Sequence, residues 1–351
     1  MTLFAAPAAM LEGLTLAGGW KVGEKISRSS TATGGCFSES YSVSRDGERG
    51  FLKALDYSLA LQQPDQVVAL QELTAAYLHE RSLLENCAAE RLSHVVMALD
   101  FGEVEVPGQG PLSRVQYLIL ESADGDVRAH LDTLDALDLA WSLRSVHHVA
   151  VGLQQLHRRN IFHQDTKPSN VLVFAGGTRK IGDLGRASRQ GYTAAHDGLL
   201  VPGDPIYAPP ELLYGYMLPE ESRRRMACDM YLLGSLLVFF FTRVGMTPAW
   251  GAGLHESLYP ANWGGSFSEV LPHIRDAFDK AIQTMSEAIP ATFRDRLIAT
   301  LRELCDPDPS VRGDPRARAR NQNPYALERY VSRLDRLARE AELQLKRSIG
   351  L

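Results

Sequence analysis

The sequence predicts an α+β protein built from two unequal lobes. The first part of the chain alternates turn residues with short β-favouring runs and contains a single helical stretch. After Glu121 the pattern is helical for most of the remaining length, with one small hairpin in its middle. We therefore expect a small β-rich N-terminal lobe with one main helix and a larger, mostly helical C-terminal lobe. The hinge falls near residues 121–125, and ligands usually bind in the cleft at such a junction.

The composition excludes several classes of protein. With 45% hydrophobic and 23% charged residues, the 351-residue chain is typical of a soluble globular protein. Its formal net charge of −5 gives no general attraction to nucleic acid or to an anionic membrane. Residues 1–9 are apolar but carry no positive charge, which argues against a signal peptide. We expect a cytoplasmic protein with no nucleic-acid or membrane partner.

Two further features support this expectation. The cysteines form no CxxC pair, so neither a zinc site nor a disulfide framework is expected and a reducing compartment is the simplest setting. The most apolar run, residues 231–241, is about 11 residues long and therefore too short to span a bilayer as a helix. We expect it to be a buried core helix. The four cysteines are Cys36, Cys87, Cys228 and Cys305.

The elements of the N-terminal lobe follow from local patterns. Residues 27–35 are rich in Ser, Thr and Gly, and a strand follows at residues 40–43. Asp46-Gly47 is a strong hairpin signal, and residues 50–55 form the returning strand. A periodic apolar stripe predicts a helix over residues 65–87. Two more strands are expected at residues 95–106 and 115–120, with a turn at residues 107–110 between them.

The C-terminal lobe begins with a long helical pattern at residues 134–158, and short strands are expected at residues 171–174 and 179–181. Near the end of the chain, Asn323 and Pro324 resemble an N-cap followed by proline at the first helical position. The apolar stripe that follows indicates a helix packed on its own domain, with partner binding or dimerisation as the alternative. The predicted division is an extension at 1–19, lobes at 20–121 and 122–317, and this amphipathic helix at 318–351.

The strongest chemical signal is the segment 163–172, which is followed by Asp183 in the stretch 181–185. Phosphoryl transfer relies on positioning and charge compensation, because negative charge spreads over the phosphate oxygens in the transition state. Asp165 can accept the proton of an attacking hydroxyl, and Lys167 can reach the transferring phosphate. Asn170 and Asp183 supply oxygen ligands for Mg²⁺. Gly185 is expected to let the backbone turn beside the metal.

These residues closely resemble the catalytic loop and the metal-binding motif of eukaryotic-like protein kinases. Three further segments follow in the family's order, namely Ala208-Pro209-Pro210-Glu211, the stretch from Asp229 to Gly234, and the stretch from Asp306 to Arg312. The resemblance implies the bilobal protein-kinase fold and a structural ion pair between Arg312 and Glu211. It implies that His163 is a core residue under the catalytic loop rather than a catalyst. It covers roughly residues 20 to 315.

The resemblance extends to the nucleotide-binding residues. Lys53 stands where the family keeps its phosphate-binding lysine, and Glu80 is the best match for its carboxylate partner. Glu72, nearer in sequence to Lys53, is the alternative. Backbone groups of Glu121 and Ala123 are expected to bind the adenine edge. The implied cofactors are ATP and Mg²⁺, with nucleotide contacts from Gly35, Phe37, Lys53, Glu121, Ala123 and Leu172.

The glycine loop and its neighbourhood depart from the family pattern. In residues 33–40 only Gly35 clearly matches, because Thr33, Ser38 and Ser40 replace family residues. Backbone N–H groups can still approach phosphate there, but less freely. Phe51 replaces a small residue beside adenine, so the nucleotide pocket is expected to be tighter or reshaped.

The second lobe departs at two positions next to the catalytic residues. Gln164 replaces the arginine that normally holds a phosphorylated activation segment, here residues 183–211. This suggests activity without phosphorylation of that segment, or regulation by other means. Asp204 stands where a threonine usually bonds the catalytic aspartate and lysine; it would repel Asp165 but could pair with Lys167. Leu184 in place of phenylalanine keeps an apolar residue.

The sequence therefore predicts a Ser/Thr protein kinase, of a kind that resembles bacterial members of the family, with a protein substrate that is possibly the chain itself. Lys167 argues against a tyrosine kinase and against a small-molecule phosphotransferase. The alternative is a pseudokinase that acts as a nucleotide-binding or scaffolding module, which the degenerate glycine loop favours. Ser188, Tyr192 and Thr193 are candidate autophosphorylation sites, on the expectation that they are exposed hydroxyls.

Overall fold

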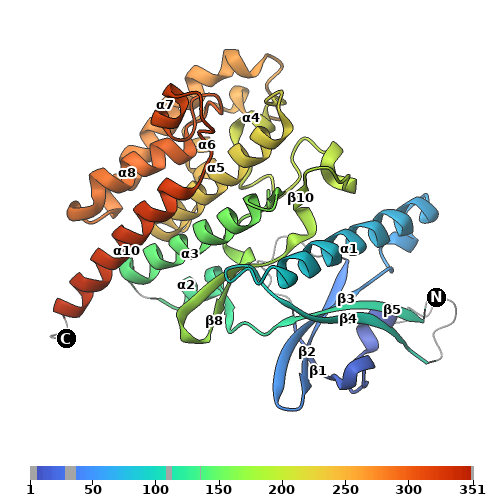
Figure 1. The fold of residues 1–351 in the computed structure, drawn as a ribbon. Coiled ribbons are helices and arrows are strands. Elements are labelled where there is room, and N and C mark those ends of the chain that lie inside the picture. Colours follow the sequence, from blue (N-terminus) through green and yellow to red (C-terminus); the bar gives the residue numbers. More distant parts are fainter. Residues whose placement is uncertain (1–5, 28–36, 108–112, 135, 349–351) are drawn as a thin grey trace. The chain divides into compact units, whose positions relative to one another are not determined.

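The computed structural model describes residues 6–27, 37–107, 113–134 and 136–348 (Figure 1). Its contacts divide the chain into two compact units. The first unit contains the residues up to Asp124 together with the short piece Asp183–Gly185, and the second contains the remainder. The boundary at residues 124–125 falls inside the predicted hinge segment.

The first unit is a five-stranded antiparallel sheet with one long helix. The strand order is β1-β2-β3-β5-β4, so β3 and β5 lie in its interior. The predicted hairpin is present, and both of its turn residues have positive φ, 49° at Asp46 and 87° at Gly47. The elements are β1 (Lys21–Lys25), β2 (Ser38–Arg45), β3 (Glu48–Leu55), α1 (Gln66–Ala89), β4 (Ala98–Glu105) and β5 (Arg114–Glu121).

Alternation along β3 decides which of its side chains reach the core. Leu52 and Ala54 are fully buried against the core of the sheet, whereas Phe51 and Lys53 are only half-buried. Because successive side chains point to opposite faces of a strand, Phe51 and Lys53 share the other face. The helix α1 begins as its sequence predicts, since the Asp65 carboxylate accepts a hydrogen bond from the Val68 N–H at 3.1 Å.

The residues before β1 pack on this sheet. They include two short 3₁₀ helices, η1 (Pro7–Met10) and η2 (Ala17–Gly19). Leu11 and Trp20 are fully buried in the same core as Tyr41 of β2. The Tyr41 hydroxyl donates to the Ala8 carbonyl at 2.7 Å. The predicted N-terminal extension therefore contributes apolar side chains to the core of the first unit.

The second unit is mainly helical and carries two small sheets, β6-β8-β9 and β7-β10. The predicted helix at 134–158 is shorter at its start, because Asp138 caps it through a 2.8 Å hydrogen bond from the Trp141 N–H. The predicted small hairpin is present as β8 and β9. The helices are α2 (Val127–Asp132), α3 (Leu139–His157), α4 (Pro210–Leu213), α5 (Glu221–Thr242), α6 (Met246–Gly251), α7 (Phe267–Ala288), α8 (Ala291–Cys305), α9 (Pro315–Ala319) and α10 (Glu328–Ser348). The strands are β6 (Gly125–Asp126), β7 (Ile161–Phe162), β8 (Val171–Phe174), β9 (Thr178–Ile181) and β10 (Ser188–Arg189).

The helix α5 forms the centre of this unit and packs on α3 and α8. Its 22 residues make it longer than the apolar run seen in the sequence, and by length and composition it could cross a membrane. It is the one such helix among the described residues, and 83% of its apolar window is buried inside the protein. The prediction of a buried core helix is confirmed, although the helix is not as short as expected.

The last helix, α10, packs along α3, as the green and red helices in Figure 1 show. Its side chains Leu334 and Ala338 are fully buried in the core of the unit. The predicted start of this helix is wrong. Asn323 instead accepts a hydrogen bond from the Tyr325 N–H at 3.0 Å in a turn, and the helix begins only at Glu328.

Candidate active site

Lys53 lies in an ion-paired cluster within the first unit. Its Nζ is 2.9 Å from both carboxylate oxygens of Glu80 and 3.3 Å from Oδ1 of Asp183. Burial acts to lower the pKa of Lys53, but the charges of Asp183 and Glu80 raise it above its ordinary value. Lys53 is therefore a fixed cation at neutral pH. The alternative partner, Glu72, is exposed on α1, so the structure pairs Lys53 with Glu80.

The backbone around Asp183 is tightly constrained. Asp183 itself has a positive φ of 57°, a conformation that is uncommon for a residue other than glycine. The chain turns at Gly185 as expected, in the short 3₁₀ helix η7 (Leu184–Arg186), although Gly185 itself does not have positive φ. Its lack of a side chain matters for space instead, because a Cβ there would lie 3.3 Å from Asp183 Oδ1 and 3.6 Å from Glu80 Oε2. The next residue toward the N-terminus, Leu184, is fully buried as expected.

Asp165 is held in one orientation by its neighbours in the second unit. The Asn170 amide nitrogen donates to the Asp165 carbonyl at 2.8 Å and to its Oδ2 at 3.1 Å. The other oxygen, Oδ1, accepts a 2.8 Å hydrogen bond from the backbone N–H of Asp204. All of the catalytic-loop side chains concerned are almost completely buried. The 3₁₀ helix η5 (Pro168–Asn170) brings Asn170 back to Asp165.

Lys167 lies between two carboxylates. Its Nζ is 3.2 Å from Asp165 Oδ2 and 3.4 Å from Asp204 Oδ2. The pairing of Asp204 with Lys167 resolves the alternative that the sequence left open. The expected repulsion between Asp204 and Asp165 is offset, because the lysine lies between their carboxylates and the Asp204 backbone donates to Asp165.

Asp229, which is completely buried in α5, anchors the catalytic loop (residues 163–170). Its carboxylate accepts hydrogen bonds from the backbone N–H groups of His163 at 2.9 Å and Gln164 at 2.6 Å. A third contact joins it to Nε2 of His157 at 2.8 Å. His163 is also completely buried; its Nε2 bonds to the Gly182 carbonyl at 3.0 Å. The prediction that His163 is a core residue under this loop is confirmed.

Gln164 connects the catalytic loop to the activation segment. Its backbone has a positive φ of 60°. Its side-chain amide donates to Ser188 Oγ at 2.8 Å, and Ser188 Oγ lies 2.5 Å from Asp197 Oδ1. Asp197 in turn is 2.7 Å from the guanidinium of Arg225. Ser188 is fully buried, so its prediction as an exposed hydroxyl is wrong; Tyr192 and Thr193 are exposed.

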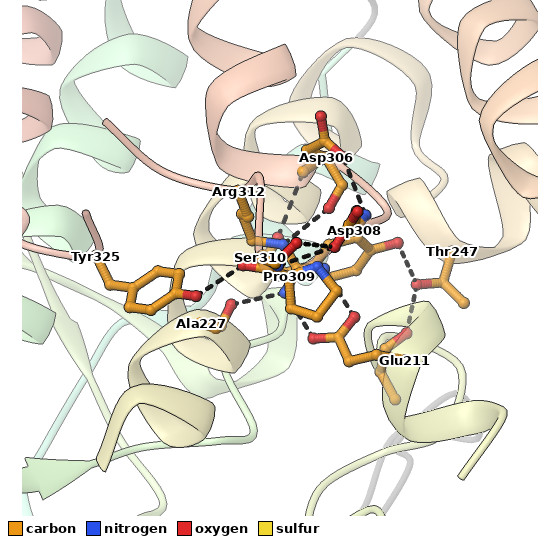
Figure 2. Close-up of polar contacts among 12 residues, drawn as sticks. Glu211, Ala227, Thr247, Asp306, Asp308, Pro309, Ser310, Arg312 and Tyr325 are labelled. Carbon is orange, nitrogen blue, oxygen red and sulfur yellow. Dashed lines mark hydrogen bonds and ion pairs between the residues drawn. The ribbon is translucent and has the colours of Figure 1, made fainter. Parts of the chain in front are cut away.

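The far end of the activation segment is fixed by the buried ion pair that the sequence predicts. Both guanidinium nitrogens of Arg312 lie 2.7 Å from the carboxylate of Glu211, and the pair is confirmed (Figure 2). Arg312 also donates to the carbonyls of Ala227 and Asp306. Burial acts to lower the pKa of Arg312, but the charge of Glu211 raises it, so the guanidinium stays charged. Pro210 begins the helix α4, which carries Glu211 in its first turn.

The predicted nucleotide contacts are placed as follows. Gly35, with Thr33 and Cys36 beside it, lies outside the described residues. Phe37 is exposed and its carbonyl accepts a hydrogen bond from the Asp56 N–H at 2.9 Å. Glu121 ends β5, Ala123 lies in the connection that follows, and Leu172 lies in β8 of the second unit.

The donor atoms suit a hard divalent cation. Asp183 offers a carboxylate, and Asn170 offers its amide oxygen, because its amide nitrogen is bonded to Asp165. Carboxylate and amide oxygens are the ligands that Mg²⁺ prefers in proteins, so the donor chemistry of each residue, one in each unit, suits the ion. Among the described residues, no group of three or more His, Cys, Asp or Glu side chains is placed to hold a metal by itself.

The sequence does not reveal three of the residues that organise the site. His157, Asp197 and Arg225 lie outside the segments that carry the resemblance, and their partners are 72, 9 and 28 residues away in the sequence. A buried carboxylate needs several hydrogen-bond donors. This requirement of Asp229 is the sequence feature that could have predicted a partner such as His157.

Comparison with known proteins gives consistent results. A family model described as the protein kinase domain matches residues 51–322. The chain is 30% identical to an Aurora kinase of Debaryomyces hansenii over 38% of its length, and 30% identical to a serine/threonine-protein kinase, drp72, of Corynebacterium efficiens over 46%. It is 27% identical to the serine/threonine-protein kinase PknA of Mycobacterium tuberculosis over 48%. These matches cover 30%, 29% and 38% of the relatives' own lengths, so the chain spans well under half of each relative.

Proposed function

This chain belongs to the protein kinase domain family, and from that premise we propose that it transfers the γ-phosphoryl group of ATP to Ser or Thr hydroxyls of a protein substrate, possibly itself. The observation that carries the proposal is the fixed arrangement of Asp165, Lys167 and Asn170 in the second unit. Relatives of both bacterial and eukaryotic origin are named as protein kinases, which supports the same class of reaction.

In this proposal Asp165 accepts the proton of the attacking hydroxyl. A general base must be oriented before it can act, and both oxygens of Asp165 are held by donors from Asn170, Lys167 and the Asp204 backbone. The carboxylate therefore needs little rearrangement during the reaction, which is the property that favours catalysis by positioning.

Lys167 would compensate the charge of the transferring phosphoryl group. Its ammonium is held between Asp165 and Asp204. The second carboxylate makes the local charge of these three side chains −1, where a threonine at position 204 would leave it neutral. We expect this extra negative charge to make transfer more dependent on the divalent cation than in a kinase with threonine at that position.

The ion pair between Lys53 and Glu80 would orient the α- and β-phosphates of the nucleotide. Asn170 and Asp183 are the proposed ligands of Mg²⁺, which when bound neutralises charge on the phosphate oxygens. Gly35, Phe37, Glu121, Ala123 and Leu172 are the proposed contacts to the rest of the nucleotide. A cytoplasmic location stays a prediction from the sequence.

The second candidate function is a pseudokinase that binds nucleotide or acts as a scaffold. One observation favours it, since Phe51, which stands where the family has a small residue, is half-buried on the same face of β3 as Lys53. The organised Asp165 cluster opposes it, because a scaffold has no physical need for a buried, fully hydrogen-bonded base.

The test is incubation of the purified chain with γ-labelled ATP and Mg²⁺, alone and with a generic basic protein, beside the Asp165→Ala variant. We expect label on Ser or Thr with the wild type and none with the variant, while nucleotide binding by thermal shift is retained in both. Absence of label in both, with a thermal shift by ATP, would replace the kinase with the nucleotide-binding pseudokinase. Absence of both signals would mean that the chain does not bind ATP.

A further inference from the structure

The activation segment contains few hydroxyls that could regulate it. Between Asp183 and Glu211 the sequence has only two Ser or Thr residues, Ser188 and Thr193. Ser188 is completely buried, and its Oγ is hydrogen-bonded to Gln164 and Asp197. Thr193 is therefore the only exposed Ser or Thr of the segment.

A carboxylate lies at the centre of the contacts that hold this segment. Asp197, in the short 3₁₀ helix η8 (Ala195–Gly198), uses Oδ1 to accept hydrogen bonds from Ser188 Oγ at 2.5 Å and from the Arg225 guanidinium at 2.7 Å. Its Oδ2 accepts a 2.7 Å hydrogen bond from the Ala194 N–H. The Arg225 side chain is only 5% exposed, so this ion pair is well shielded from water.

We infer that Asp197, in place of a phosphoryl group, holds the activation segment beside the catalytic loop, so that the chain needs no phosphorylation of this segment to position Asp165. The inference rests on the proposed kinase function. Asp197 is a positioning residue in this scheme, because it acts on Asp165 through Ser188 and Gln164 and not by direct contact.

The path from Asp197 to the base is short and continuous. Arg225 on α5 holds Asp197, Asp197 holds Ser188, and Ser188 accepts a hydrogen bond from the Gln164 side chain at 2.8 Å. Gln164 directly precedes Asp165, and its backbone N–H is fixed to Asp229 at 2.6 Å. A shift of the segment at residue 197 would therefore be transmitted to the backbone of the catalytic loop.

The charge needed for this contact is built into the protein. Burial acts to raise the pKa of Asp197, but hydrogen bonds from Ala194 and Ser188 and the charge of Arg225 outweigh it and lower that pKa below its ordinary value. The carboxylate is ionised throughout the neutral range without any modifying enzyme.

The same stretch of chain contacts the catalytic loop at a second point. Gly203 lies so close to the loop that a Cβ on it would be 2.4 Å from the Gln164 carbonyl oxygen and 2.8 Å from Asp165 Oδ1. The adjacent Asp204 N–H donates to Asp165. Residues 188 to 204 are therefore docked on the loop at both of their ends by protein groups alone.

The experiment compares phosphate-free full-length protein with three variants. The wild type is treated with a phosphatase, the phosphatase is removed, and mass spectrometry confirms that no phosphate remains. Asp197→Asn removes the charge, and Thr193→Ala removes the exposed hydroxyl. Asp335→Asn is the matched control, because it also removes a carboxylate that binds an arginine, Arg144, but lies on α10. Hydrogen exchange of residues 188–204 and the initial rate of phosphoryl transfer are measured for each.

The inference predicts that residues 188–204 are protected in phosphate-free wild type, in Thr193→Ala and in Asp335→Asn, and lose protection in Asp197→Asn. Transfer should begin without a lag in the first three, and kcat should fall roughly tenfold or more in Asp197→Asn while the KM for ATP changes little. Rapid exchange of this stretch in phosphate-free wild type, or a loss of activity in Thr193→Ala, would overturn it.

Two safeguards keep the result clear. If Asp197→Asn does not fold, Ser188→Ala breaks the next contact of the path and is expected to lose the same protection. If no sample transfers phosphate, even after preincubation with ATP, the proposed function fails. The hydrogen-exchange comparison then still decides whether Asp197 holds the segment.

Discussion

Two buried ion pairs anchor the activation segment, one in its middle and one at its carboxyl end. At the carboxyl end, Glu211 pairs with Arg312, and both side chains are almost completely buried. In the middle of the segment, Asp197 pairs with Arg225, and Asp197 keeps partial exposure. The first pair joins two segments that family resemblance identifies, and the second joins residues that no motif marks. The comparison teaches that sequence motifs predict the anchor at the carboxyl end, whereas the anchor nearer the catalytic loop is visible only in the structure.

The largest effect is expected from breaking the carboxyl-end anchor. Arg312→Ala leaves the Glu211 carboxylate buried and unpaired, so it should destabilise the protein by about 3–5 kcal/mol. Urea unfolding of the second unit measures this change. Arg296→Ala, which removes an exposed pair with Glu340, is the control and should cost about 0–1 kcal/mol. Equal losses in the two variants would contradict the distinction between buried and exposed anchors.

The next effect tests the close approach of the segment to the catalytic loop. Gly203→Ala places a Cβ against the Gln164 carbonyl and Asp165, so the segment or the loop must move. Because a displacement of about 1 Å can cost a factor of about 100 in rate, we expect kcat to fall by roughly that factor. Gly198→Ala is the matched control, since a Cβ there meets nothing within 4 Å and its φ is not positive. A full kcat in Gly203→Ala would show that this contact does not position Asp165.

A smaller effect is expected at Asp204. Asp204→Asn removes the charge that helps to hold Lys167, but Lys167 keeps its contact with Asp165. Because asparagine keeps an oxygen that can accept from Lys167, we expect a loss of about 1 kcal/mol, which corresponds to a decrease in kcat of about fivefold. Steady-state kinetics measure it, and Asp204→Thr, which supplies a hydroxyl acceptor, should recover part of the rate. An increase in kcat in Asp204→Asn would mean that the carboxylate acts mainly by repelling the phosphoryl group.

The smallest effect concerns pH. The pKa of Asp197 is lowered in the folded protein, so its stabilising contribution is fully present above the ordinary aspartate pKa of about 3.9 and is lost as the pH falls through the folded value. The difference in unfolding free energy between wild type and Asp197→Asn should therefore stay constant from pH 8 to about pH 5 and shrink below about pH 4. Urea titrations at several pH values check this. A difference that changed between pH 6 and pH 8 would assign the dependence to another group.

Much of the fold could be predicted from the sequence because its signals are local. The Asp46-Gly47 turn and the Asp65 cap each act within a few residues, and both are present as expected. The predicted start of α10 is wrong because it also rests on a local signal. An asparagine side chain can accept a backbone N–H in a turn as well as at a helix N-terminus, and Asn323 does so in a turn.

The sequence predicts a contact in the site only where the family pattern pairs two residues. Glu80 was preferred to Glu72 from the family pattern, and the structure shows that Glu80 is the one that faces Lys53. The prediction that Ser188 is an exposed hydroxyl is wrong, because the sequence around it does not show the side chains that bury it. Its Oγ is hydrogen-bonded to both Gln164 and Asp197. A contact among three residues that lie apart in the chain has no characteristic sequence spacing, so the sequence does not predict it.

The packing of α10 on α3 has a practical consequence for dividing this chain. The family match ends at residue 322, before α10 begins. A fragment cut there would uncover the face of α3 that α10 covers, and would leave Arg144 without Asp335 and Glu342. Newly exposed apolar surface of this kind promotes aggregation. Work on the isolated kinase domain therefore requires the chain through Ser348.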